Sequence, residues 1–543
     1  MSRFDVILIH PPAVYDFRRQ ALFPGPLAAN VAQAQFTRVP IGMLSLAAYL
    51  DRHGFKVRID NLGDRMVNDP AFDVAKHLKN LSSVIFAVGL HFQQHAQGAL
   101  EIARLCKQFH PHSPVVLGGL TATRFHEEIL RSYEFIDAVV RGEAEKAFLA
   151  LLQAYEGKGR ITGTPNLTFR TDSGTVAVTA LLPPVPDLDE FEYTRFDLLE
   201  PKTAVFPAEA FPRWSLEVCR GCIYNCAICG GSSYSYRTYL GRTRPAFRSP
   251  ARIVQDIHSL TVQGIKFIGL YQDPRMGGEA YWRELVTALR QGNLDIERLS
   301  MDLLAPADED FIREIASIGK QVMVHICPDT GSEKVRRQLG RHYTNEQLLA
   351  TVKLCHKYLL PVTSFFSIGL AGEDRDTIPA TLELWDKLSD MENLALSRNR
   401  FLGLEGSAAQ GGPILGPILL DPGSPAFDLP EQHGYRLLYP DLTGYARAMT
   451  QPSWQQWLNY ETEQLDTAAL TEVIFQATAF TIDQRAEYGF NNRYQTESER
   501  RKLQADIIAA REIERIMKIL DPEARENALQ QLRSRSEEFL QQR

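Results

Sequence analysis

Short apolar runs alternate with amphipathic stretches along roughly the first 155 residues. Each run has the length of a buried strand, and the stretch after it has the apolar spacing of a helix. The predicted strands are Val6–Ile9, Val57–Asp60, Val84–Val88, Val115–Leu117 and Ala138–Val140. The predicted helices are Ile41–His53, Phe72–Leu78, Gln97–Phe109, Arg124–Ser132 and Glu145–Tyr155. Strands separated by single helices predict a parallel sheet, whose ligands bind at the carboxyl ends of the strands.

The same alternation returns between about residues 205 and 410. The predicted strands are Arg213–Val218, Phe267–Tyr271, Leu299–Leu304, Val322–Cys327, Val362–Ile368 and Leu394–Leu402. The predicted helices are Pro250–Gln263, Tyr281–Gln291, Asp308–Ile318, Ser332–Leu339 and Asn345–Tyr358. Six strand–helix units predict a partial (β/α)6 barrel, which places its chemistry at the carboxyl ends of the strands.

The remaining segments connect or follow these two α/β parts. A β-hairpin is predicted within residues 161–182, followed by a linker rich in proline and aspartate. Gly403–Asp428 is predicted as a long loop over the barrel mouth, and the chain after about residue 441 as mostly helical. Trp454, Trp457 and Tyr460 recur at helical spacing and are predicted to be core. The expected domains are therefore 1–160, a hairpin and linker over 161–204, 205–410 and 411–543.

Composition narrows the class of protein. Hydrophobic residues make up 44% of the chain and charged residues 23%, which excludes disorder as the main state. The net charge of −7 argues against a nucleic-acid-coating protein. No apolar run is long enough to span a membrane, and the N-terminus lacks the features of a signal peptide. We therefore expect a cytoplasmic protein with neither a nucleic-acid partner nor a membrane span.

Four of the seven cysteines lie within eleven residues: Cys219, Cys222, Cys226 and Cys229. Thiolates select zinc, copper(I) or iron–sulfur clusters, and structural zinc usually takes four ligands in two separated pairs. Both C-x-x-C pairs, Cys219/Cys222 and Cys226/Cys229, lie in this one segment, and no separate cysteine pair elsewhere completes such a site. The C-x-x-x-C-x-x-C spacing suits three corners of a cubane whose fourth iron stays open. A zinc loop or a redox thiol pair remains an alternative, and Cys219 is either a bystander or an alternative ligand.

This cysteine spacing resembles that of the radical S-adenosylmethionine (SAM) superfamily. The resemblance implies that Cys222, Cys226 and Cys229 bind a [4Fe-4S] cluster, whose open iron chelates SAM for reductive cleavage to a 5′-deoxyadenosyl radical. Ser364–Glu373 resembles the fifth strand of the family, and Gly277-Gly278-Glu279 its GGE motif. The implied SAM contacts are Tyr224, Gln272, Asp273, Glu279, Asp302, Asp329, Arg341 and Gly369. Cys327, at a strand end, is either a catalytic candidate or core filler.

The first 160 residues resemble the Rossmann-like (flavodoxin-like) cobalamin-binding domain that precedes some radical SAM domains. The resemblance rests on His10-Pro11-Pro12, Pro40-Ile41-Gly42, Gly118-Gly119 and Arg141-Gly142-Glu143. The implied cobalamin contacts are Pro12, Ile41, Gly42, Gly118, Gly119, Thr121, Arg141, Gly142 and Glu143. The chain lacks the D-x-H-x-x-G motif that supplies a cobalt-ligating histidine in some relatives. His91 and His95 follow the third strand and are interpreted as loop histidines, although they could face the ligand.

Together these resemblances imply a cobalamin-dependent radical SAM enzyme with a [4Fe-4S] cluster, SAM and cobalamin. The expected reaction is methylation of an unactivated carbon in a small-molecule or lipid-like substrate, with a one-electron donor of the flavodoxin or ferredoxin type. An oxidative cyclase or a carbon–carbon bond-forming enzyme of the same architecture is the first alternative. A non-catalytic cobalamin or iron–sulfur sensor is the second, although no helix-turn-helix signal supports it.

Overall fold

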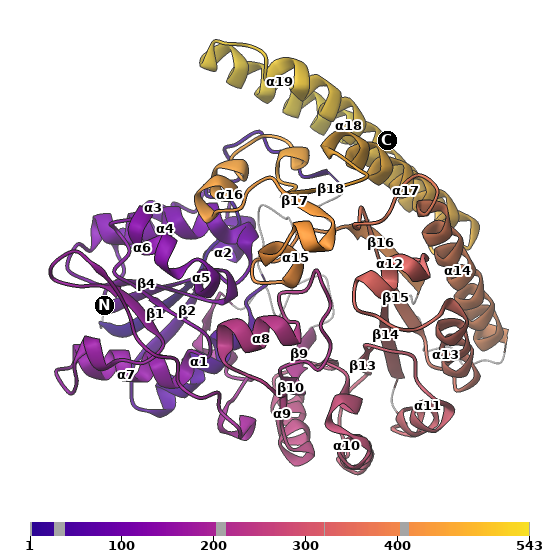
Figure 1. The fold of residues 1–543 in the computed structure, drawn as a ribbon, viewed down its shortest axis with the longest axis horizontal. Coiled ribbons are helices and arrows are strands. Elements are labelled where there is room, and N and C mark those ends of the chain that lie inside the picture. The colour runs from indigo at the N-terminus through magenta and orange to yellow at the C-terminus, as the bar shows by residue number, and fades with distance from the viewer. Residues whose placement is uncertain (1–2, 26–37, 202–212, 320, 402–411, 542–543) are drawn as a thin grey trace.

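The computed structural model describes residues 3–25, 38–201, 213–319, 321–401 and 412–541. Figure 1 shows two α/β parts side by side, with a helical C-terminal region across one end of both. Among the described residues, no helix is both long enough and apolar enough to cross a membrane.

The first sheet has eight strands in the order β7-β6-β5-β4-β3-β1-β2-β8. Their bounds are β1 Phe4–His10, β2 Val57–Asn61, β3 Ser83–Gly89, β4 Val115–Gly118, β5 Ala138–Val140, β6 Leu167–Arg170, β7 Val176–Val178 and β8 Leu199–Glu200. Strands β1 to β5 are parallel in the flavodoxin-like order, which confirms the predicted fold class. The hairpin β6–β7 extends this sheet by pairing antiparallel with β5, and β8 closes the other edge.

Helices cover both faces of this sheet. They are α1 Ile41–Arg52, α2 Leu62–Asn68, α3 Val74–Lys79, α4 Ala96–Phe109, α5 Leu120–Arg124, α6 His126–Ser132 and α7 Glu145–Tyr155. Alternate residues of β1 face opposite ways. Val6 and Leu8 share a core with α1 and α7, whereas Ile7 and Ile9 share one with α4. The near-continuous apolar run of β1 is thereby buried on both sides, as a parallel sheet requires.

The second sheet has six parallel strands in the spatial order β9-β12-β13-β14-β15-β16. Their bounds are β9 Arg213–Glu217, β12 Phe267–Tyr271, β13 Arg298–Leu303, β14 Gln321–Asp329, β15 Val362–Ile368 and β16 Gly412–Pro417. The helices of this part are α9 Pro250–Val262, α10 Glu279–Gln291, α11 Glu309–Ala316, α12 Glu333–Gln338, α13 Asn345–Lys357 and α14 Ile378–Phe401. Because β9 and β16 are the two edges of the sheet, the described strands form an open, partial barrel.

The prediction of the sixth strand at Leu394–Leu402 was wrong. Residues up to Phe401 belong to α14, and Leu402 lies outside the described residues. Leu384 and Leu388 of this helix are buried, whereas Leu394 is 61% exposed, so its apolar run is not a buried strand. The sixth strand is β16, inside the segment predicted as a loop. The two prolines of β16 are typical of a loop, so the sequence did not indicate a strand there. A sheet tolerates proline in an edge strand, and β16 is an edge strand.

The C-terminal region combines short elements with three long helices. These elements are α15 Pro425–Asp428, β17 Tyr435–Leu437, α16 Leu442–Ala448, β18 Tyr460–Thr462, α17 Thr467–Glu487, α18 Arg493–Ile516 and α19 Pro522–Gln541. Trp454, Trp457 and Tyr460 are buried core residues, as predicted. Helices α18 and α19 form a small core with Ala21 and Phe23 of the N-terminal part. The segment around Ala21 and Phe23 is therefore packed against the C-terminal helices.

Candidate functional site

The three predicted cluster cysteines lie in the loop between the β10 strand (Cys219–Arg220) and the α8 helix (Ser233–Leu240). All three are free thiols. The backbone amide of Tyr224 donates to Cys222 Sγ at 3.4 Å, and that of Gly231 donates to Cys229 Sγ at 3.3 Å. Burial raises the pKa of each thiol, to about 12 for Cys229. The amides stabilise negative charge on sulfur, so this loop is suited to thiolates that a metal holds deprotonated.

The described residues contain no group of three or more His, Cys, Asp or Glu side chains compact enough to hold one metal ion. In a cubane cluster each thiolate binds a different iron, so the three sulfurs lie farther apart than in a single-ion site. The three thiols of this loop supply one thiolate for each of three irons, which is the donor set of a [4Fe-4S] cluster with one open iron.

Contacts from other elements hold the cysteine loop. The amide of Ala227 donates to Leu339 O at 3.0 Å, and the carbonyl of Ala227 accepts from Ala426 N at 2.8 Å. Asp421 Oδ2 accepts from Gly230 N at 3.0 Å, next to Cys229. Burial raises the pKa of Asp421 to about 6. The sequence did not reveal Asp421 because it lies in a Gly- and Pro-rich segment without periodicity.

Asp329 and Arg341 form a largely buried ion pair beside the cysteines. Arg341 Nε lies 2.5 Å from Asp329 Oδ2, and Nη1 donates to Leu304 O at 3.3 Å. Asp329 has a φ of 60°, a left-handed conformation that aspartate tolerates. The positive charge of Arg341 lowers the pKa of Cys226 and opposes the larger effect of burial. The structure therefore brings these two predicted SAM contacts to the cysteine loop.

Two other predicted strand-end acids already have partners. Asp273 accepts from Leu304 N at 2.9 Å and pairs with Arg275 at 2.6 Å. Asp302 accepts from Gln272 N at 3.2 Å, and its other oxygen lies 3.3 Å from His325 Nδ1. His325 lies next to Asp302 because of the register between β13 and β14. The sequence did not reveal that register. The roles of Asp273, Asp302 and Gln272 toward SAM stay predictions.

The remaining predicted residues of the barrel differ in exposure. The Cys327 thiol has its pKa raised to about 12 by burial, and the Cys327 carbonyl accepts from Tyr343 at 3.1 Å. Gly369 has a φ of 85°, and its amide donates to the buried Glu373 at 2.9 Å. In contrast, Glu279 is exposed and pairs with Arg283 on α10. The structure therefore gives no contact between Glu279 and the cysteine loop.

The predicted cobalamin contacts lie at the carboxyl ends of β1, β4 and β5 and at the start of α1. Leu90 N donates to Gly118 O at 2.7 Å, and the Thr121 hydroxyl donates to His91 O at 3.0 Å. Gly119 has a φ of 114°, and a Cβ there would lie 2.7 Å from the His91 backbone, so glycine is required. At Gly42 a Cβ would meet no atom within 4 Å. Gln94 is buried at this edge, and its Oε1 has no hydrogen-bond partner among the described residues.

Burial lowers the pKa of two histidines at the same edge. The pKa falls to about 4 for His91 and well below the usual value of 6.5 for His95. The ring of His10 contacts that of His95 edge-on, with 5.0 Å between centroids. An edge built from backbone turns, a buried amide oxygen and neutral imidazoles fits a large ligand such as a corrinoid better than a compact anion.

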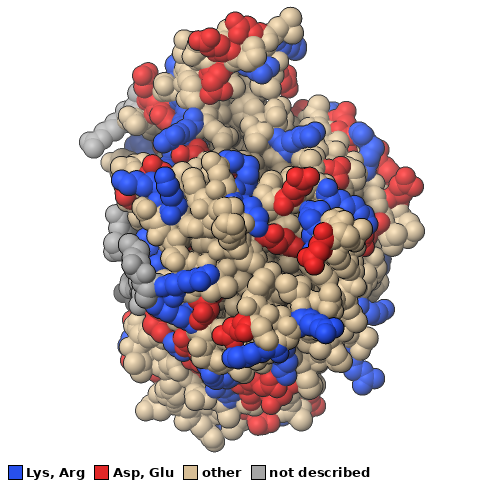
Figure 2. Space-filling model, turned by 90° about the vertical axis from the view of Figure 1, so that its left-hand side faces the viewer, with Lys and Arg blue, Asp and Glu red and all other residues tan. Residues whose placement is uncertain are grey.

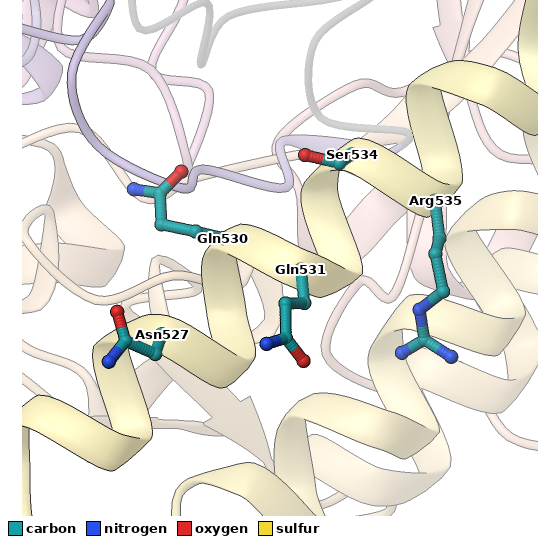
Figure 3. Close-up of a pocket in the computed structure, with 5 residues that line it drawn as sticks. All are labelled: Asn527, Gln530, Gln531, Ser534 and Arg535. Atoms are coloured by element: carbon teal, nitrogen blue, oxygen red, sulfur yellow. The ribbon is translucent and has the colours of Figure 1, made fainter.

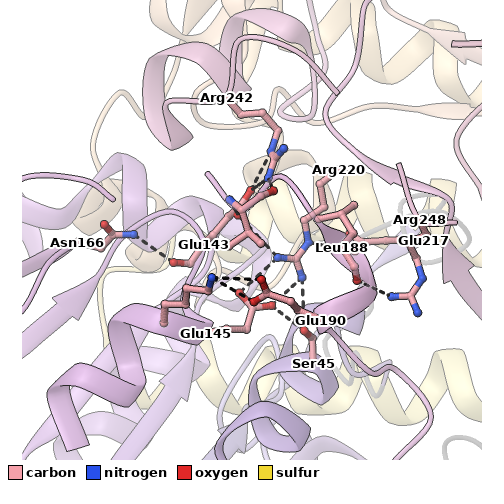
Figure 4. A network of polar contacts seen from close by, with 12 residues as sticks. Ser45, Glu143, Glu145, Asn166, Leu188, Glu190, Glu217, Arg220, Arg242 and Arg248 are labelled. Atoms are coloured by element: carbon pink, nitrogen blue, oxygen red, sulfur yellow. Dashed lines mark hydrogen bonds and ion pairs between the residues drawn. The ribbon is translucent and has the colours of Figure 1, made fainter. Parts of the chain in front are cut away.

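The side chains of the Arg141-Gly142-Glu143 turn point to protein partners. Arg141 donates to Thr179 O of the hairpin region. Glu143 accepts from Arg242 Nε at 2.9 Å (Figure 4). The amide of Gly142 donates to Thr123 Oγ1 at 3.0 Å. The predicted cobalamin contacts at this turn stay predictions, and the side chain of Glu143 already joins the two α/β parts.

Two other surfaces differ from this site. A pocket on α19 is lined by amide, hydroxyl and guanidinium groups, from Asn527, Gln530, Gln531, Ser534 and Arg535 (Figure 3). Basic and acidic side chains are interspersed over the face of the molecule in Figure 2, as on an ordinary protein surface. The α19 pocket is lined by no cysteine, so the cysteine loop stays the candidate site.

Comparisons with known proteins agree with this geometry. Residues 27–152 match the B12 binding domain, and residues 216–384 match the radical SAM superfamily. The chain therefore carries a B12 binding domain followed by a radical SAM domain, as the sequence predicted. Its cofactors are those of the two domains: cobalamin, a [4Fe-4S] cluster and SAM.

Individual relatives are distant. An uncharacterized methyltransferase of Pyrococcus horikoshii is 25% identical over 391 residues, which cover 72% of this chain and 79% of the relative. An anaerobic magnesium-protoporphyrin IX monomethyl ester cyclase of Rubrivivax gelatinosus is 25% identical over 55% of this chain, and the match spans 53% of the cyclase. The radical SAM methyltransferase TsrM of Kitasatospora setae, solved with cobalamin and a [4Fe-4S] cluster, superposes with a TM-score of 0.58 at 17% identity. That match covers 94% of this chain and 100% of TsrM and shows a shared fold.

Proposed function

We propose that the protein is a cobalamin-dependent radical SAM methyltransferase acting on an unactivated carbon of a small-molecule or lipid-like substrate. One observation carries this proposal: a B12 binding domain and a three-cysteine radical SAM loop lie in one chain and are joined by direct contacts. Arg242, which follows the cysteine loop, pairs with Glu143 at the carboxyl end of β5. Both predicted cofactor sites therefore lie close to the same domain boundary.

The bound cofactors would supply a carbon-centred radical from SAM and a methyl group from cobalamin. The residues of this chain hold and orient them. Cys222, Cys226 and Cys229 would bind the cluster, and the amides of Tyr224 and Gly231 stabilise the charge of two of these thiolates. The Arg341 guanidinium adds a positive charge next to Cys226. Buried backbone turns at the ends of β1, β3 and β4 would carry the corrinoid.

The test uses the full chain, purified without oxygen and reconstituted with iron and sulfide. Incubation with SAM, hydroxocobalamin and a one-electron donor of the flavodoxin or ferredoxin type should yield S-adenosylhomocysteine and 5′-deoxyadenosine, measured by mass spectrometry. Replacing Cys222, Cys226 and Cys229 by alanine together should abolish cluster binding and 5′-deoxyadenosine. The double variant Cys106→Ala and Cys355→Ala is the matched control, because both cysteines are buried outside the loop.

The outcomes separate the parts of the proposal. Iron binding that survives the triple cysteine variant would overturn the cluster assignment. Formation of 5′-deoxyadenosine without S-adenosylhomocysteine would overturn methyl transfer and favour the second candidate, an oxidative cyclase or carbon–carbon bond-forming enzyme. The match to a magnesium-protoporphyrin ester cyclase supports that candidate. A protein that binds both cofactors and cleaves no SAM would point to a sensor.

A further inference from the structure

A buried polar cluster joins the B12 binding domain to the start of the cysteine loop (Figure 4). We call it the Arg220 cluster: Arg220, Glu145, Ser45 and Glu217. Arg220 is 7% exposed and Glu145 is 3% exposed. Arg220 Nη2 donates to Glu145 Oε1 at 2.7 Å, and Nη1 donates to Oε2 at 3.3 Å. The Arg220 guanidinium and the Glu145 carboxylate therefore meet in a two-pronged pair, the geometry that fixes both groups most strictly.

The barrel end of this cluster is directly connected to the cysteines. Arg220 is the second residue of β10 and precedes Cys222 by two positions. Its backbone is held in the barrel domain by antiparallel pairing with Ala246 in the β11 strand (Ala246–Phe247). Its Nε also donates to Glu217 Oε2 at 3.2 Å, at the end of β9. A shift of the Arg220 side chain therefore has a short path to Cys222.

The other end of the Arg220 cluster contains residues of α7 and α1, two helices that carry or follow predicted cobalamin contacts. Glu145 is the first residue of α7 and follows the Arg141-Gly142-Glu143 turn after one residue, Ala144. Ser45 lies in the second turn of α1, after Ile41 and Gly42, and its hydroxyl donates to Glu145 Oε1 at 2.6 Å. Both helices begin at the ligand edge of the first sheet. One carboxylate thus connects Arg220 to the starts of both helices.

Aromatic rings shield the cluster from water. The Arg220 guanidinium lies over the Phe191 ring, 4.5 Å from its centroid, and Tyr193 OH lies 3.4 Å from Nη2. Phe191 and Tyr193 are fully buried. In such surroundings a charged pair has few alternative arrangements, so a displacement of one partner is passed to the other rather than absorbed by solvent.

We propose that the Arg220 cluster couples the two cofactor sites. When the iron–sulfur cluster orders the cysteine loop, the link through Arg220 and Glu145 places α1 and α7 for cobalamin. Cobalamin in turn favours the cysteine geometry that binds the iron–sulfur cluster, because coupling between two binding sites is reciprocal. The inference rests on the binding of both cofactors and is independent of whether a methyl group is transferred.

The test is a titration of the full chain with hydroxocobalamin, followed by absorbance, in the cluster-free and the reconstituted protein. Wild-type protein should bind hydroxocobalamin at least about five-fold more tightly when the cluster is present, the lower end of typical coupling. In Arg220→Gln and Glu145→Gln this ratio of dissociation constants should fall to near one. Arg220→Lys keeps the charge without the fork and should restore part of the ratio.

Asp256→Asn is the matched control. It weakens another buried pair, Arg248 with Asp256, and Arg248 otherwise donates to the linker carbonyls of Leu188 and Phe191. This variant should lower the unfolding temperature yet keep the wild-type ratio. The ratio compares two states of one variant, so a loss of fold stability alone does not change it.

Two results would overturn the proposal. One is a wild-type ratio of one, and the other is an unchanged ratio in both Arg220→Gln and Glu145→Gln. If Arg220→Gln does not fold, Glu145→Gln and Arg220→Lys still measure the coupling. Failure of methyl transfer is seen separately, in the assay for S-adenosylhomocysteine, so the two proposals fail independently.

Discussion

Two largely buried arginines flank the cysteine loop, and they differ in what they connect. Arg341 pairs with Asp329 at 2.5 Å, and both residues belong to the same barrel. Arg220 pairs with Glu145 at 2.7 Å, across 75 positions of the chain and across the domain boundary. Side-chain exposure is 12% and 13% in the first pair and 8% and 4% in the second. The two pairs have the same chemistry and similar burial but different partners.

This difference separates a local electrostatic role from a geometric one. The charge of Arg341 lowers the pKa of Cys222 and of Cys226, against the larger opposite effect of burial. Arg220 is anchored by carboxylates on both sides of the boundary, from Glu217 of the barrel and Glu145 of the B12 binding domain. We infer that one arginine adjusts the charge around the thiols, while the other fixes where the loop lies relative to the neighbouring domain.

The largest effect on stability is expected from Arg220→Met. This change leaves Glu145 buried without its partner, and breaking such a pair costs about 3–5 kcal/mol. The thermal unfolding midpoint of the cluster-free protein should fall steeply, measured by circular dichroism. Because the pair crosses the boundary, the unfolding curve should also broaden or split into two steps. A single transition with an unchanged midpoint would contradict the role of this pair at the boundary.

A smaller loss in the free energy of unfolding, about 3 kcal/mol, is expected from Arg341→Met. The pair is slightly more exposed, and its loss leaves Asp329 charged within the barrel. Adding Asp329→Asn should recover part of the loss, because asparagine removes the uncompensated charge and tolerates the left-handed backbone at this position. The same melting experiment measures both variants. No recovery in the double variant would show that the arginine acts through packing rather than charge.

The sequence predicts the cysteine loop in more detail than the ligand edge of the B12 binding domain. The cysteine loop contains side chains of one type at tight spacing, and this spacing carries the family resemblance that implied Cys222, Cys226 and Cys229 as the cluster ligands. The B12-binding edge is built from backbone turns around Gly118 and Gly119, which any parallel sheet also needs. The resemblance of this domain to cobalamin-binding domains could be recognised in the sequence, but its individual cobalamin contacts stay predictions.

Long-range pairing explains most of what the sequence did not reveal. Glu145 and Arg220 are each ordinary helix-start and strand residues locally, and their pairing depends on the packing of two domains. Asp421 lies far along the chain from Gly230, which it contacts. The sixth strand was misplaced because β16 carries glycines and prolines, whereas α14 carries the more strand-like apolar run. In each case tertiary contacts override the local pattern.

A buried carboxylate that has neutral partners sharpens the comparison with the two ion pairs. Glu373 is fully buried and accepts from Gly369 N, Leu370 N and the Thr330 hydroxyl at 2.9–3.0 Å. Burial raises its pKa from 4.5 to about 7. The folded state therefore binds more protons than the unfolded state between these values. Stability from this group is present below about pH 4.5 and is lost as the pH rises toward 7.

Glu373→Gln should remove this pH dependence. Relative to the variant, the wild-type protein should lose up to about 3 kcal/mol between pH 4.5 and 7, since one pKa unit corresponds to about 1.4 kcal/mol. Melting temperatures of both proteins across this range provide the measurement. If the difference between them stays constant or grows in favour of the wild type as the pH rises, Glu373 is ionised in the fold and its hydrogen bonds outweigh burial.

The smallest effect on stability is expected for an arginine whose ion pair is exposed to solvent. Arg500 Nη2 lies 2.6 Å from Asp483 Oδ1, but the two side chains are 54% and 59% exposed. Solvent screens their attraction, and ordering both side chains costs entropy, so Arg500→Ala should change stability by at most about 0.5 kcal/mol. The measurement is the same thermal unfolding at low and high salt. A loss near that of Arg341→Met would mean that pair distance, rather than burial, sets the cost, and the contrast between buried and exposed arginines in this protein would not hold.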